Sequence, residues 1–338
     1  MNNKIDFVVT WVDGNDSNWL NEKNKYINEK NGEIDACDNR YKDWGFFKYW
    51  FRGVEKYASW VNKVYLITCG HLPKWLNINN EKLVIINHKD YIPDEYLPTF
   101  NSNVIELNIN KIKELSDNFV LFNDDMFLID YVKDTDFFKN NIPCDSIALN
   151  VHCPQKSKII QNISFNDAGI INEHFNFKEC LRNNRNKWYN LKNGKSLVRT
   201  MALQFCPRFP GFMINHLSIP YNKSTFDKVW NAEYDILDET SKHKFRQADE
   251  VNHWLMKEWQ IASGNIENQP LNFGKAFFIR EETTDETVNK IVEYIVNRKM
   301  KEICINDGQL TGKKFDSCVK KIQEAFEYNL PDKSMFEI

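Results

Sequence analysis

The sequence predicts an α/β protein with a largely parallel, Rossmann-like sheet that is flanked by helices. Short apolar runs recur between residues 5 and 128 and alternate with segments of helical spacing. Acidic or Asn-containing turns follow several of these runs. The run at residues 119–128 carries two adjacent carboxylates, Asp124 and Asp125, at its centre. Because ligands of such sheets gather at the carboxyl ends of the strands, a binding site is expected there.

The composition limits the class of protein. A chain of 338 residues can form one large α/β domain or two modest ones. Its formal net charge of −3 provides no overall field that would attract nucleic acid, so no nucleic-acid partner is expected. The eight cysteines include no Cys-x-x-Cys pair, which argues against a zinc ribbon or a disulfide scaffold and favours a reducing compartment.

No targeting signal or membrane span is expected. Residues 1–6 pass directly into an apolar strand without the layout of a signal peptide. No apolar run approaches the roughly eighteen residues that a membrane helix requires. We therefore expect a cytoplasmic protein, for which peripheral contact with the inner face of the membrane stays open.

The first strand is expected at residues 5–12 and contains Trp11. The turn Asp13-Gly14-Asn15-Asp16 ends it, and a helix follows from Ser17, its candidate cap, to about residue 29. This order is the first half of a βαβ unit, which is a common place to bind a nucleotide. The alternative is a plain turn in which the Asp and Asn side chains only cap.

A second helix is expected at residues 41–60. Its core-facing positions recur at helical spacing and are Phe47, Phe51, Val54 and Ala58. Arg40, Asp43 and Arg52 lie off that stripe. Guanidinium groups match phosphate oxygens, so the two arginines suit a diphosphate, and a solvated helix face is the alternative.

Two further strands are expected at residues 64–68 and 83–86. The loop at residues 97–102 then leads into a helix at about residues 103–115, with Asn101 or Ser102 as its cap. A free helix N-terminus attracts anions, so this loop is a candidate for phosphate binding.

Asp124 and Asp125 are costly inside apolar sequence, because two neighbouring carboxylates resist joint ionisation and burial removes water from both. A divalent cation offsets both costs, and hard oxygen ligands suit Mg²⁺ or Mn²⁺. The alternative is that Asp124 caps a turn and Asp125 is solvated.

The second half of the chain contains a basic stretch and a candidate histidine. Residues 178–199 include seven Lys or Arg and one Glu, which suits an anionic acceptor or a lipid head group, or else a solvated face. His216 follows an apolar segment, and a lone histidine in that position is either structural or catalytic.

A helix is expected to open at residues 245–251, with Arg246 near its N-terminus. The helix dipole disfavours a cation there, which suggests another role for Arg246. Beyond about residue 270 two amphipathic helices are expected. We therefore divide the chain into a catalytic α/β domain at residues 1–270, with a basic insertion at about 155–205, and a C-terminal helical segment at residues 271–338.

Four stretches resemble, in order, the Stealth family of sugar-1-phosphate transferases. The first contains Thr10-Trp11-Val12-Asp13-Gly14, the second runs from Arg40 to Asp125, the third rests on His216 and Pro220, and the fourth is Phe245-Arg246 with Asp249. The chain departs from the family at Trp44-Gly45-Phe46 and in the spacing of the third stretch.

The resemblance implies an α/β core related to the GT-A-like nucleotide-sugar glycosyltransferases. It also implies a reaction in which a nucleotide-diphospho-sugar, such as a UDP-sugar, donates its sugar 1-phosphate to a glycan hydroxyl during capsular or cell-surface polysaccharide synthesis. The expected partners are that donor, a glycan or lipid-linked oligosaccharide acceptor, and other capsule-synthesis enzymes.

The resemblance further implies roles for individual residues. Asp125, His216 and Arg246 would be catalytic, with His216 taking the proton of the acceptor. Asp124 and Asp125 would hold Mg²⁺ or Mn²⁺ at the diphosphate. The substrate-binding residues would be Trp11, Asp13, Gly14, Arg40, Asp43, Arg52, Asn101, Ser102 and Asp249.

Two other functions stay open from the residues. Paired carboxylates at a strand end equally suit a metal-dependent glycosyltransferase that releases a nucleoside diphosphate. A non-catalytic glycan-binding subunit is the third alternative.

Overall fold

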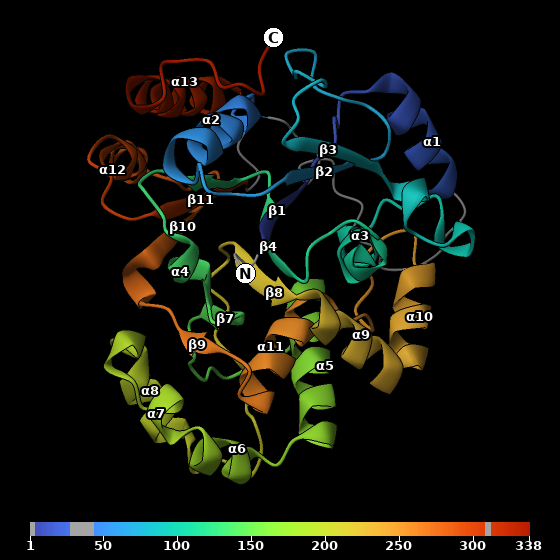
Figure 1. Cartoon of the computed structure of the whole chain (residues 1–338), viewed down its shortest axis with the longest axis vertical. Helices are drawn as coiled ribbons and strands as arrows, with labels where there is room; N and C mark the ends of the chain where they lie inside the picture. The colour runs from blue at the N-terminus through green and yellow to red at the C-terminus, as the bar shows by residue number, and fades with distance from the viewer. Residues whose placement is uncertain (1–3, 28–43, 308–311) are drawn as a thin grey trace.

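The structure is a computed structural model that describes residues 4–27, 44–307 and 312–338 (Figure 1). Arg40 and Asp43, two of the expected substrate-binding residues, therefore lie outside the described residues.

The main sheet has five strands in the order β3-β2-β1-β4-β8. Its strands are β1 (Ile5–Thr10), β2 (Val64–Thr68), β3 (Leu83–Asn87), β4 (Asn118–Asn123) and β8 (Ile219–Asn222). The first four are parallel, and only β8, at the edge beside β4, is antiparallel. The predicted α/β class with a largely parallel sheet is confirmed.

The sheet is covered by helices on both faces, which explains why its strands are almost continuously apolar. Successive residues of β1 face opposite sides: Phe7 and Val9 belong to one apolar core and Val8 to the other. The first core packs against α2 (Phe47–Tyr57), α12 (Asp285–Val296) and α13 (Gly312–Asn329). The second packs against α3 (Ser102–Leu107), α5 (Ile159–His174), α9 (Lys223–Ala232), α10 (Tyr234–Lys242) and α11 (Trp254–Ser263).

The register of the parallel strands brings several strand ends to one edge. Thr10 of β1 lies opposite Ile67 of β2 on one side and Asn123 of β4 on the other. The residues that follow these three strands, including Asp13 and Asp125, therefore emerge beyond the same edge of the sheet.

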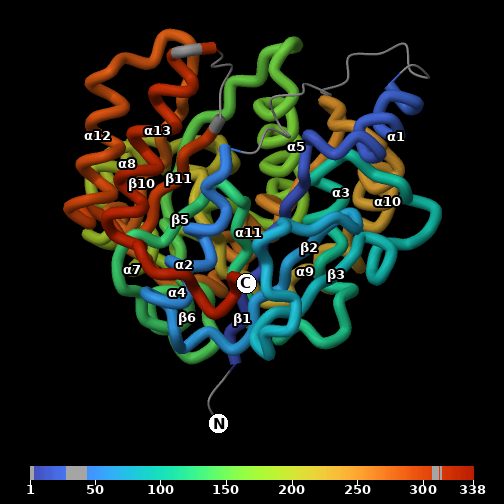
Figure 2. Tube along the Cα trace, turned by 90° about the horizontal axis from the view of Figure 1, so that it is seen from above, coloured from blue at the N-terminus to red at the C-terminus, as the bar shows by residue number. Residues whose placement is uncertain are grey.

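The C-terminal segment contains strands as well as the two expected helices. β10 (Gly274–Ile279) and β11 (Glu302–Asp307) form a second sheet with β5 (Met126–Leu128), in the order β10-β11-β5. Figure 2 shows these three strands side by side, on the side of the molecule where α12 and α13 lie. The expectation of a purely helical C-terminal segment is therefore wrong, because two of its apolar runs pair with each other and with β5.

Some helix boundaries also differ from the expectation. The first helix, α1 (Ser17–Ile27), is capped by Asp16 rather than Ser17, since the Asp16 carboxylate accepts the Trp19 N–H at 2.8 Å. The helix expected at 103–115 ends at Leu107, and a 3₁₀ turn (Ile109–Lys111) follows.

The helix expected to open at residue 245 begins only at Trp254, whose N–H is accepted by the Asn252 side chain at 2.9 Å. Arg246 therefore lies in a loop, and the argument from the helix dipole does not apply to it.

The remaining elements are short. A third sheet, in the order β6-β7-β9, contains β6 (Phe138–Lys139), β7 (Ile142–Asp145) and β9 (Glu267–Asn268). The remaining α-helices are α4 (Asp134–Phe137), α6 (Phe177–Asn183), α7 (Arg185–Trp188) and α8 (Ser196–Leu203).

Candidate active site

Asp124 and Asp125 form the turn between β4 and β5, so the apolar run expected to be one strand belongs to two sheets. β5 pairs antiparallel with β11, and Met126 lies opposite Cys304. The Ile305 N–H donates to the Asp125 carbonyl at 2.9 Å. The C-terminal sheet therefore fixes the turn that carries the two carboxylates.

A cluster of four side chains gathers at this turn. Alternate residues of β11 face the same side, so Cys304 and Asn306 both reach Asp125. The Cys304 Sγ lies 3.3 Å from Asp125 Oδ2. The Asn306 amide donates to Asp125 Oδ2 at 2.9 Å and contacts His216 Nε2 at 3.0 Å. We call these four side chains the strand-end cluster: Asp125, His216, Cys304 and Asn306.

His216 is held in an unusual conformation within this cluster. Its φ of +52° lies in the left-handed region, which a residue other than glycine adopts at a cost and which recurs at functional sites. Its ring lies against Phe278 of β10, with 5.9 Å between the ring centroids. The Asn306 amide nitrogen lies 3.0 Å from His216 Nε2. An imidazole in this position is a candidate to take a proton from a bound hydroxyl group.

The strand-end cluster offers atoms for a divalent cation. A carboxylate oxygen of Asp125, a ring nitrogen of His216 and the sulfur of Cys304 all lie within 4.8 Å of one another. Asp125 Oδ1 is buried and has no hydrogen-bond partner among the residues that the structure describes. A buried carboxylate oxygen in this state fits a bound cation, which would compensate its lost hydration.

The atoms of the cluster do not suit Mg²⁺ equally. Burial, followed by the negative charge of Asp125, raises the pKa of the Cys304 thiol well above its ordinary value. A protonated thiol is a poor ligand, and Mg²⁺ prefers oxygen. Asp125 is therefore the residue of the cluster that fits the expected cation, and Asp124 precedes it in the same turn.

Arg246 lies in the loop before α11. Its guanidinium donates to the hydroxyl of Ser102, the first residue of α3. Burial raises the pKa of Glu106, one turn along α3, to about 7, while the positive charge of Arg246 and the Ser102 hydroxyl oppose the rise. Arg246, Ser102 and Glu106 thus form one connected group.

His253 connects that group to His216. Its Nε2 lies 3.5 Å from Glu106 Oε2, and its Nδ1 lies 2.9 Å from the Tyr221 hydroxyl. Burial, and then the positive charges of His216 and Arg246, lower the pKa of His253 to about 3. His253 therefore lies within electrostatic range of both His216 and Arg246, and the grouping of Asp125, His216 and Arg246 in one site stays a prediction.

Glu250 fastens the loop that carries Arg246. This buried carboxylate accepts hydrogen bonds from the Asn101 amide at 2.9 Å, the Asn103 amide at 2.7 Å and the Gln247 N–H at 2.9 Å. Asn101 also caps α3, accepting the Asn103 N–H at 3.1 Å, which confirms it as the cap. Asn101 is thereby used in holding the loops together, α3 has only six residues, and the anion site expected at its N-terminus stays a prediction.

The end of β1 is shaped by local contacts. The Asp13 N–H donates to His71 Nε2 at 2.7 Å, and the Asp13 carboxylate accepts the Asn15 N–H at 2.9 Å, as the capping alternative predicts. Trp11 is buried, stacked on Phe47 at 5.7 Å between ring centroids. Gly14 lies in the same turn.

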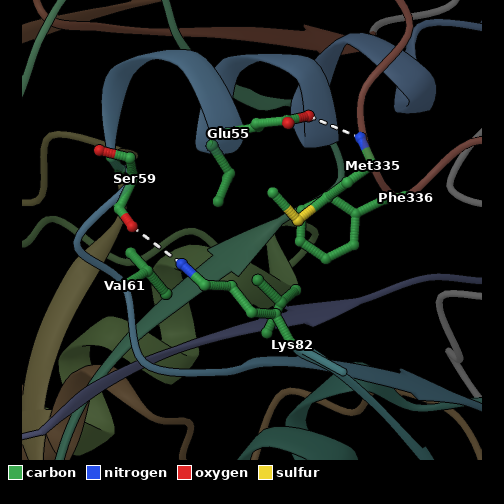
Figure 3. Close-up of a pocket in the computed structure, with 9 residues that line it drawn as sticks. Glu55, Ser59, Val61, Lys82, Met335 and Phe336 are labelled. Atoms are coloured by element: carbon green, nitrogen blue, oxygen red, sulfur yellow. Dashed lines mark hydrogen bonds between the residues drawn. The ribbon is translucent and has the colours of Figure 1, made fainter. Parts of the chain in front are cut away.

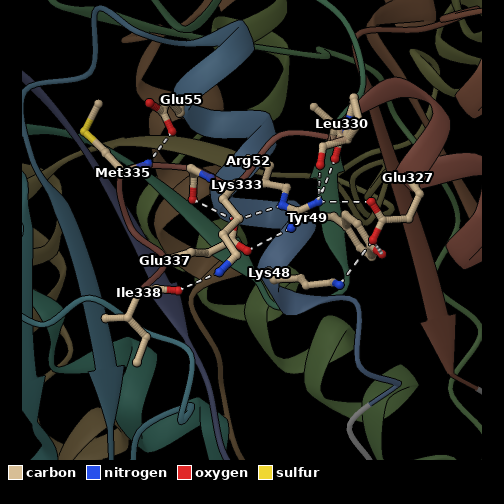
Figure 4. A network of polar contacts seen from close by, with 12 residues as sticks. Lys48, Tyr49, Arg52, Glu55, Glu327, Leu330, Lys333, Met335, Glu337 and Ile338 are labelled. Carbon is tan, nitrogen blue, oxygen red and sulfur yellow. Dashed lines mark hydrogen bonds and ion pairs between the residues drawn. The ribbon is translucent and has the colours of Figure 1, made fainter.

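Arg52 does not lie in this site. Its guanidinium forms a two-pronged pair with Glu337, at 2.8 and 2.9 Å, and also donates to Glu327 at 3.1 Å and to the Leu330 carbonyl at 2.8 Å (Figure 4). We call this group of residues the C-terminal clamp: Arg52, Glu327, Leu330 and Glu337. The expectation that Arg52 binds a diphosphate is corrected accordingly, because carboxylates of the chain itself occupy its donors.

The pocket in Figure 3 also belongs to the packing of the C-terminal segment. This cavity of about 250 Å³ lies between α2, the start of β2 and the last residues of the chain, and Met335 and Phe336 line it. Its Glu55 carboxylate accepts the Met335 N–H at 2.7 Å. The pocket lies at the amino ends of the parallel strands, at the opposite edge from Asp125, where ligands of such sheets do not usually bind.

Several residues of the site were not expected from the sequence. No sequence motif marks these residues, which are Glu106, Glu250, His253, Cys304 and Asn306. The alternation in Ile303-Cys304-Ile305-Asn306 would have predicted a strand. Asp249, an expected substrate-binding residue, is exposed on the loop that carries Arg246.

Comparison with known proteins identifies the relatives of the chain. The family description "Stealth protein CR1, conserved region 1" matches residues 3–31, and "Stealth protein CR2, conserved region 2" matches residues 40–145. A capsular polysaccharide phosphotransferase, WcwK, of Streptococcus pneumoniae is 45% identical over 335 residues, covering 99% of this chain and 98% of the relative. An exopolysaccharide phosphotransferase, cps2G, of Lactiplantibacillus plantarum is 40% identical, covering 98% and 96%.

A solved structure with similarity to the chain is that of the galactosyltransferase LgtC in complex with donor and acceptor sugar analogues. It is 6% identical, covers 98% of both chains and has a TM-score of 0.40.

Proposed function

The chain belongs to the Stealth family of capsular and exopolysaccharide phosphotransferases, and from that premise we propose the reaction that it catalyses. A nucleotide-diphospho-sugar, taken to be a UDP-sugar, donates its sugar 1-phosphate to a hydroxyl group of a capsular or cell-surface glycan. The hydroxyl oxygen attacks the phosphorus that bears the sugar, and the bond from that phosphorus to the bridging oxygen breaks. The products are a phosphodiester and a nucleoside monophosphate.

The observation that carries this proposal is that the Asn306 amide joins His216 to Asp125, whose buried Oδ1 has no hydrogen-bond partner among the described residues. The imidazole of His216 takes the proton of the attacking hydroxyl. Arg246, held by Ser102, neutralises the oxygens of the transferred phosphate. Reactions of this kind depend on positioning and charge neutralisation rather than on a covalent intermediate, and the site offers both.

A divalent cation, Mg²⁺ or Mn²⁺, supplies charge neutralisation at the diphosphate when bound. Asp125 would hold it through Oδ1, with Asp124 beside it in the turn. Asn306 orients both Asp125 and His216, because its amide contacts the two side chains. Cys304 is a buried, neutral thiol that contacts Asp125 Oδ2.

The setting of the reaction follows from the chemistry of the substrates. Nucleotide-sugars are made in the cytoplasm, so we place the reaction there. The acceptor is a glycan or a lipid-linked oligosaccharide that other capsule-synthesis enzymes extend.

The identity of the released nucleotide tests this proposal. Purified protein is incubated with Mg²⁺, capsule oligosaccharide and a panel of UDP-, GDP- and CDP-sugars, and the nucleotide is identified by anion-exchange chromatography. We expect a nucleoside monophosphate and a new phosphodiester signal by phosphorus NMR. Both should disappear with EDTA and in Asp125→Ala, and persist in Asp316→Ala, which removes an exposed carboxylate of α13.

Release of a nucleoside diphosphate would contradict the proposal. It would mean that the acceptor attacks the anomeric carbon and that the protein is a glycosyltransferase. A protein that binds the oligosaccharide but releases no nucleotide with any donor would be a glycan-binding subunit.

A further inference from the structure

The basic stretch folds into a helical region, α6 to α8, at one end of the longest axis of the molecule (Figure 1). Large apolar side chains gather there on the outside. The exposed fraction is 86% for Leu191, 72% for Val198, 49% for Met201 and 80% for Phe205. Side chains of these types are usually buried, so a group of them at the surface requires a reason.

The exposed apolar residues form a stripe on α8. Val198, Met201, Ala202 and Phe205 are spaced by three or four residues, which places them on one face of the helix and of the turn that follows it. The opposite side is polar and buried: Thr200 accepts the Leu149 N–H at 3.1 Å, and Ser196 contacts Met213 at 3.3 Å. α8 is therefore fixed by its polar side and presents its apolar side to the surroundings.

The stripe lies in a basic part of the chain. Residues 178–208 contain eight Lys or Arg and one Glu, in a chain whose formal net charge is −3. Lys192, Lys195 and Arg199 are exposed beside the stripe. An apolar face with a basic rim is the pattern of a segment that lies in the interface of an anionic bilayer. A symmetric contact between two copies of this surface would bring like charges together, which disfavours it.

The surface is connected to the candidate active site. The Arg199 guanidinium contacts the Met213 sulfur at 3.1 Å and the Asn150 side chain at 3.0 Å. Met213 precedes His216 by three residues, which span at most about 10 Å of extended chain. A membrane in contact with the apolar face of α8 would therefore lie close to His216, which we propose takes the proton of the acceptor.

We propose that α8 and the turns on either side of it, with Leu191, Val198, Met201 and Phe205, dock on an anionic lipid bilayer. In the part of the chain that the structure describes, no helix is long and apolar enough to cross a membrane. The contact is thus peripheral: the apolar stripe enters the interface, and the basic rim binds lipid head groups. It brings the enzyme to a lipid-borne acceptor and does not depend on the chemistry of the donor.

The test measures binding of the full chain to vesicles without any nucleotide. Co-sedimentation with phosphatidylcholine vesicles is compared with co-sedimentation with vesicles that also contain phosphatidylglycerol. We expect binding only in the presence of phosphatidylglycerol, weakened by salt. The double variant Val198→Ser with Phe205→Ser should bind at least about tenfold more weakly. Its matched control is Ile78→Ser with Tyr328→Ser, since these side chains are 56% and 72% exposed elsewhere.

The charge is tested in the same way. Lys192→Glu with Lys195→Glu should reduce binding at least about tenfold, and Lys290→Glu with Lys320→Glu, two exposed residues of α12 and α13, should leave it unchanged. Equal binding to both vesicle types, or equal loss in the variants and their controls, would overturn the proposal. So would a dimer in sedimentation velocity that Val198→Ser with Phe205→Ser dissociates, because a second copy would then occupy the surface. Since no turnover is measured, failure here leaves the proposed reaction standing.

Discussion

The C-terminal clamp and the strand-end cluster both join the last 70 or so residues to the α/β core, and they differ in how their polar groups are satisfied. In the clamp, the guanidinium of Arg52 meets two carboxylates and a carbonyl. In the cluster, Asp125 keeps one buried oxygen without a partner among the described residues, and His216 adopts a positive φ.

From this difference we infer that the C-terminal clamp is a structural contact and propose that the strand-end cluster is a functional one. A network whose donors and acceptors are all used holds the fold and offers nothing to a ligand. A buried oxygen without a partner and a strained backbone persist only where something else compensates them, as a substrate or cation does at an active site. The two regions therefore respond to mutation in opposite ways.

Asp125→Asn is expected to have the largest effect on activity. Removing this carboxylate should lower the rate of nucleoside monophosphate release by at least about a thousandfold, because the charge at the diphosphate loses its compensation. The melting temperature should not fall, since the amide removes a buried and incompletely paired charge. A steady-state assay and a thermal melt check both points. A fall in melting temperature with normal turnover would place Asp125 with the structural contacts.

Arg52→Ala is expected to show the reverse pattern. The substitution leaves the Glu337 carboxylate buried without its partner, which should lower the free energy of unfolding by about 3 kcal/mol in urea titrations. Lys48→Ala is the matched control, because Lys48 pairs with Glu327 at 3.3 Å but is more exposed. It should cost at most about 1 kcal/mol. Equal losses in the two variants would mean that the clamp contributes no more than a surface pair.

Asn306 tests whether β11 belongs to the site. Asn306→Ala should lower turnover roughly 10- to 100-fold with little change in stability, because the amide that orients Asp125 and His216 is lost. Asn306→Asp should also move the acidic limb of the pH–rate profile up by roughly one pH unit, since a carboxylate beside His216 favours the imidazolium. If both variants kept the turnover and the pH–rate profile of the wild type, β11 would not belong to the active site, which would then consist of residues before position 270.

Glu106→Gln addresses the titrating group that links Arg246 to His253. The pKa of Glu106 is raised from 4.5 to about 7 by burial, so the folded protein holds a proton there that the unfolded chain loses between these values. The free energy of unfolding therefore falls as the pH rises through and just above these two pKa values. Between pH 5.5 and 8 the fall is about 2 kcal/mol. Glu106→Gln should remove that part of the pH dependence, measured as the difference from the wild type in urea titrations. If the free energy of unfolding changed with pH in the same way in the wild type and in Glu106→Gln, burial would not raise the pKa of Glu106.

The sequence predicts β1, β2 and β4 well because these strands are mostly apolar and buried on both faces, whereas β3 is only partly buried and the edge strand β8 was not expected. β2 is found at residues 64–68 as expected, and the turn with Asp124 and Asp125 lies at the carboxyl end of β4. Local signals of this kind need no information about the rest of the chain. The cap of α3 at Asn101 was predictable for the same reason.

The partners of charged residues were not predictable, because they come from distant parts of the chain. Arg52 pairs with a carboxylate 285 positions away, and Asp125 meets Asn306 across 181 positions. Nothing near Arg52 in the sequence distinguishes an arginine that binds phosphate from one that holds the C-terminus. The sequence predicts a helix where the loop with Arg246 lies, because the Glu250 hydrogen bonds that hold this loop join it to residues about 150 positions away.

Activity measurements on variants of the two arginines, Arg246 and Arg52, distinguish the candidate active site from the C-terminal clamp. Nucleoside monophosphate release is assayed for Arg246→Ala and Arg52→Ala at a temperature where denaturation curves show both variants folded. We expect Arg246→Ala to lose at least about a hundredfold in rate and Arg52→Ala to stay within about threefold of the wild type. An equal loss in folded Arg52→Ala, or normal turnover in Arg246→Ala, would contradict the assignment of the active site to the strand-end cluster and its neighbouring loop.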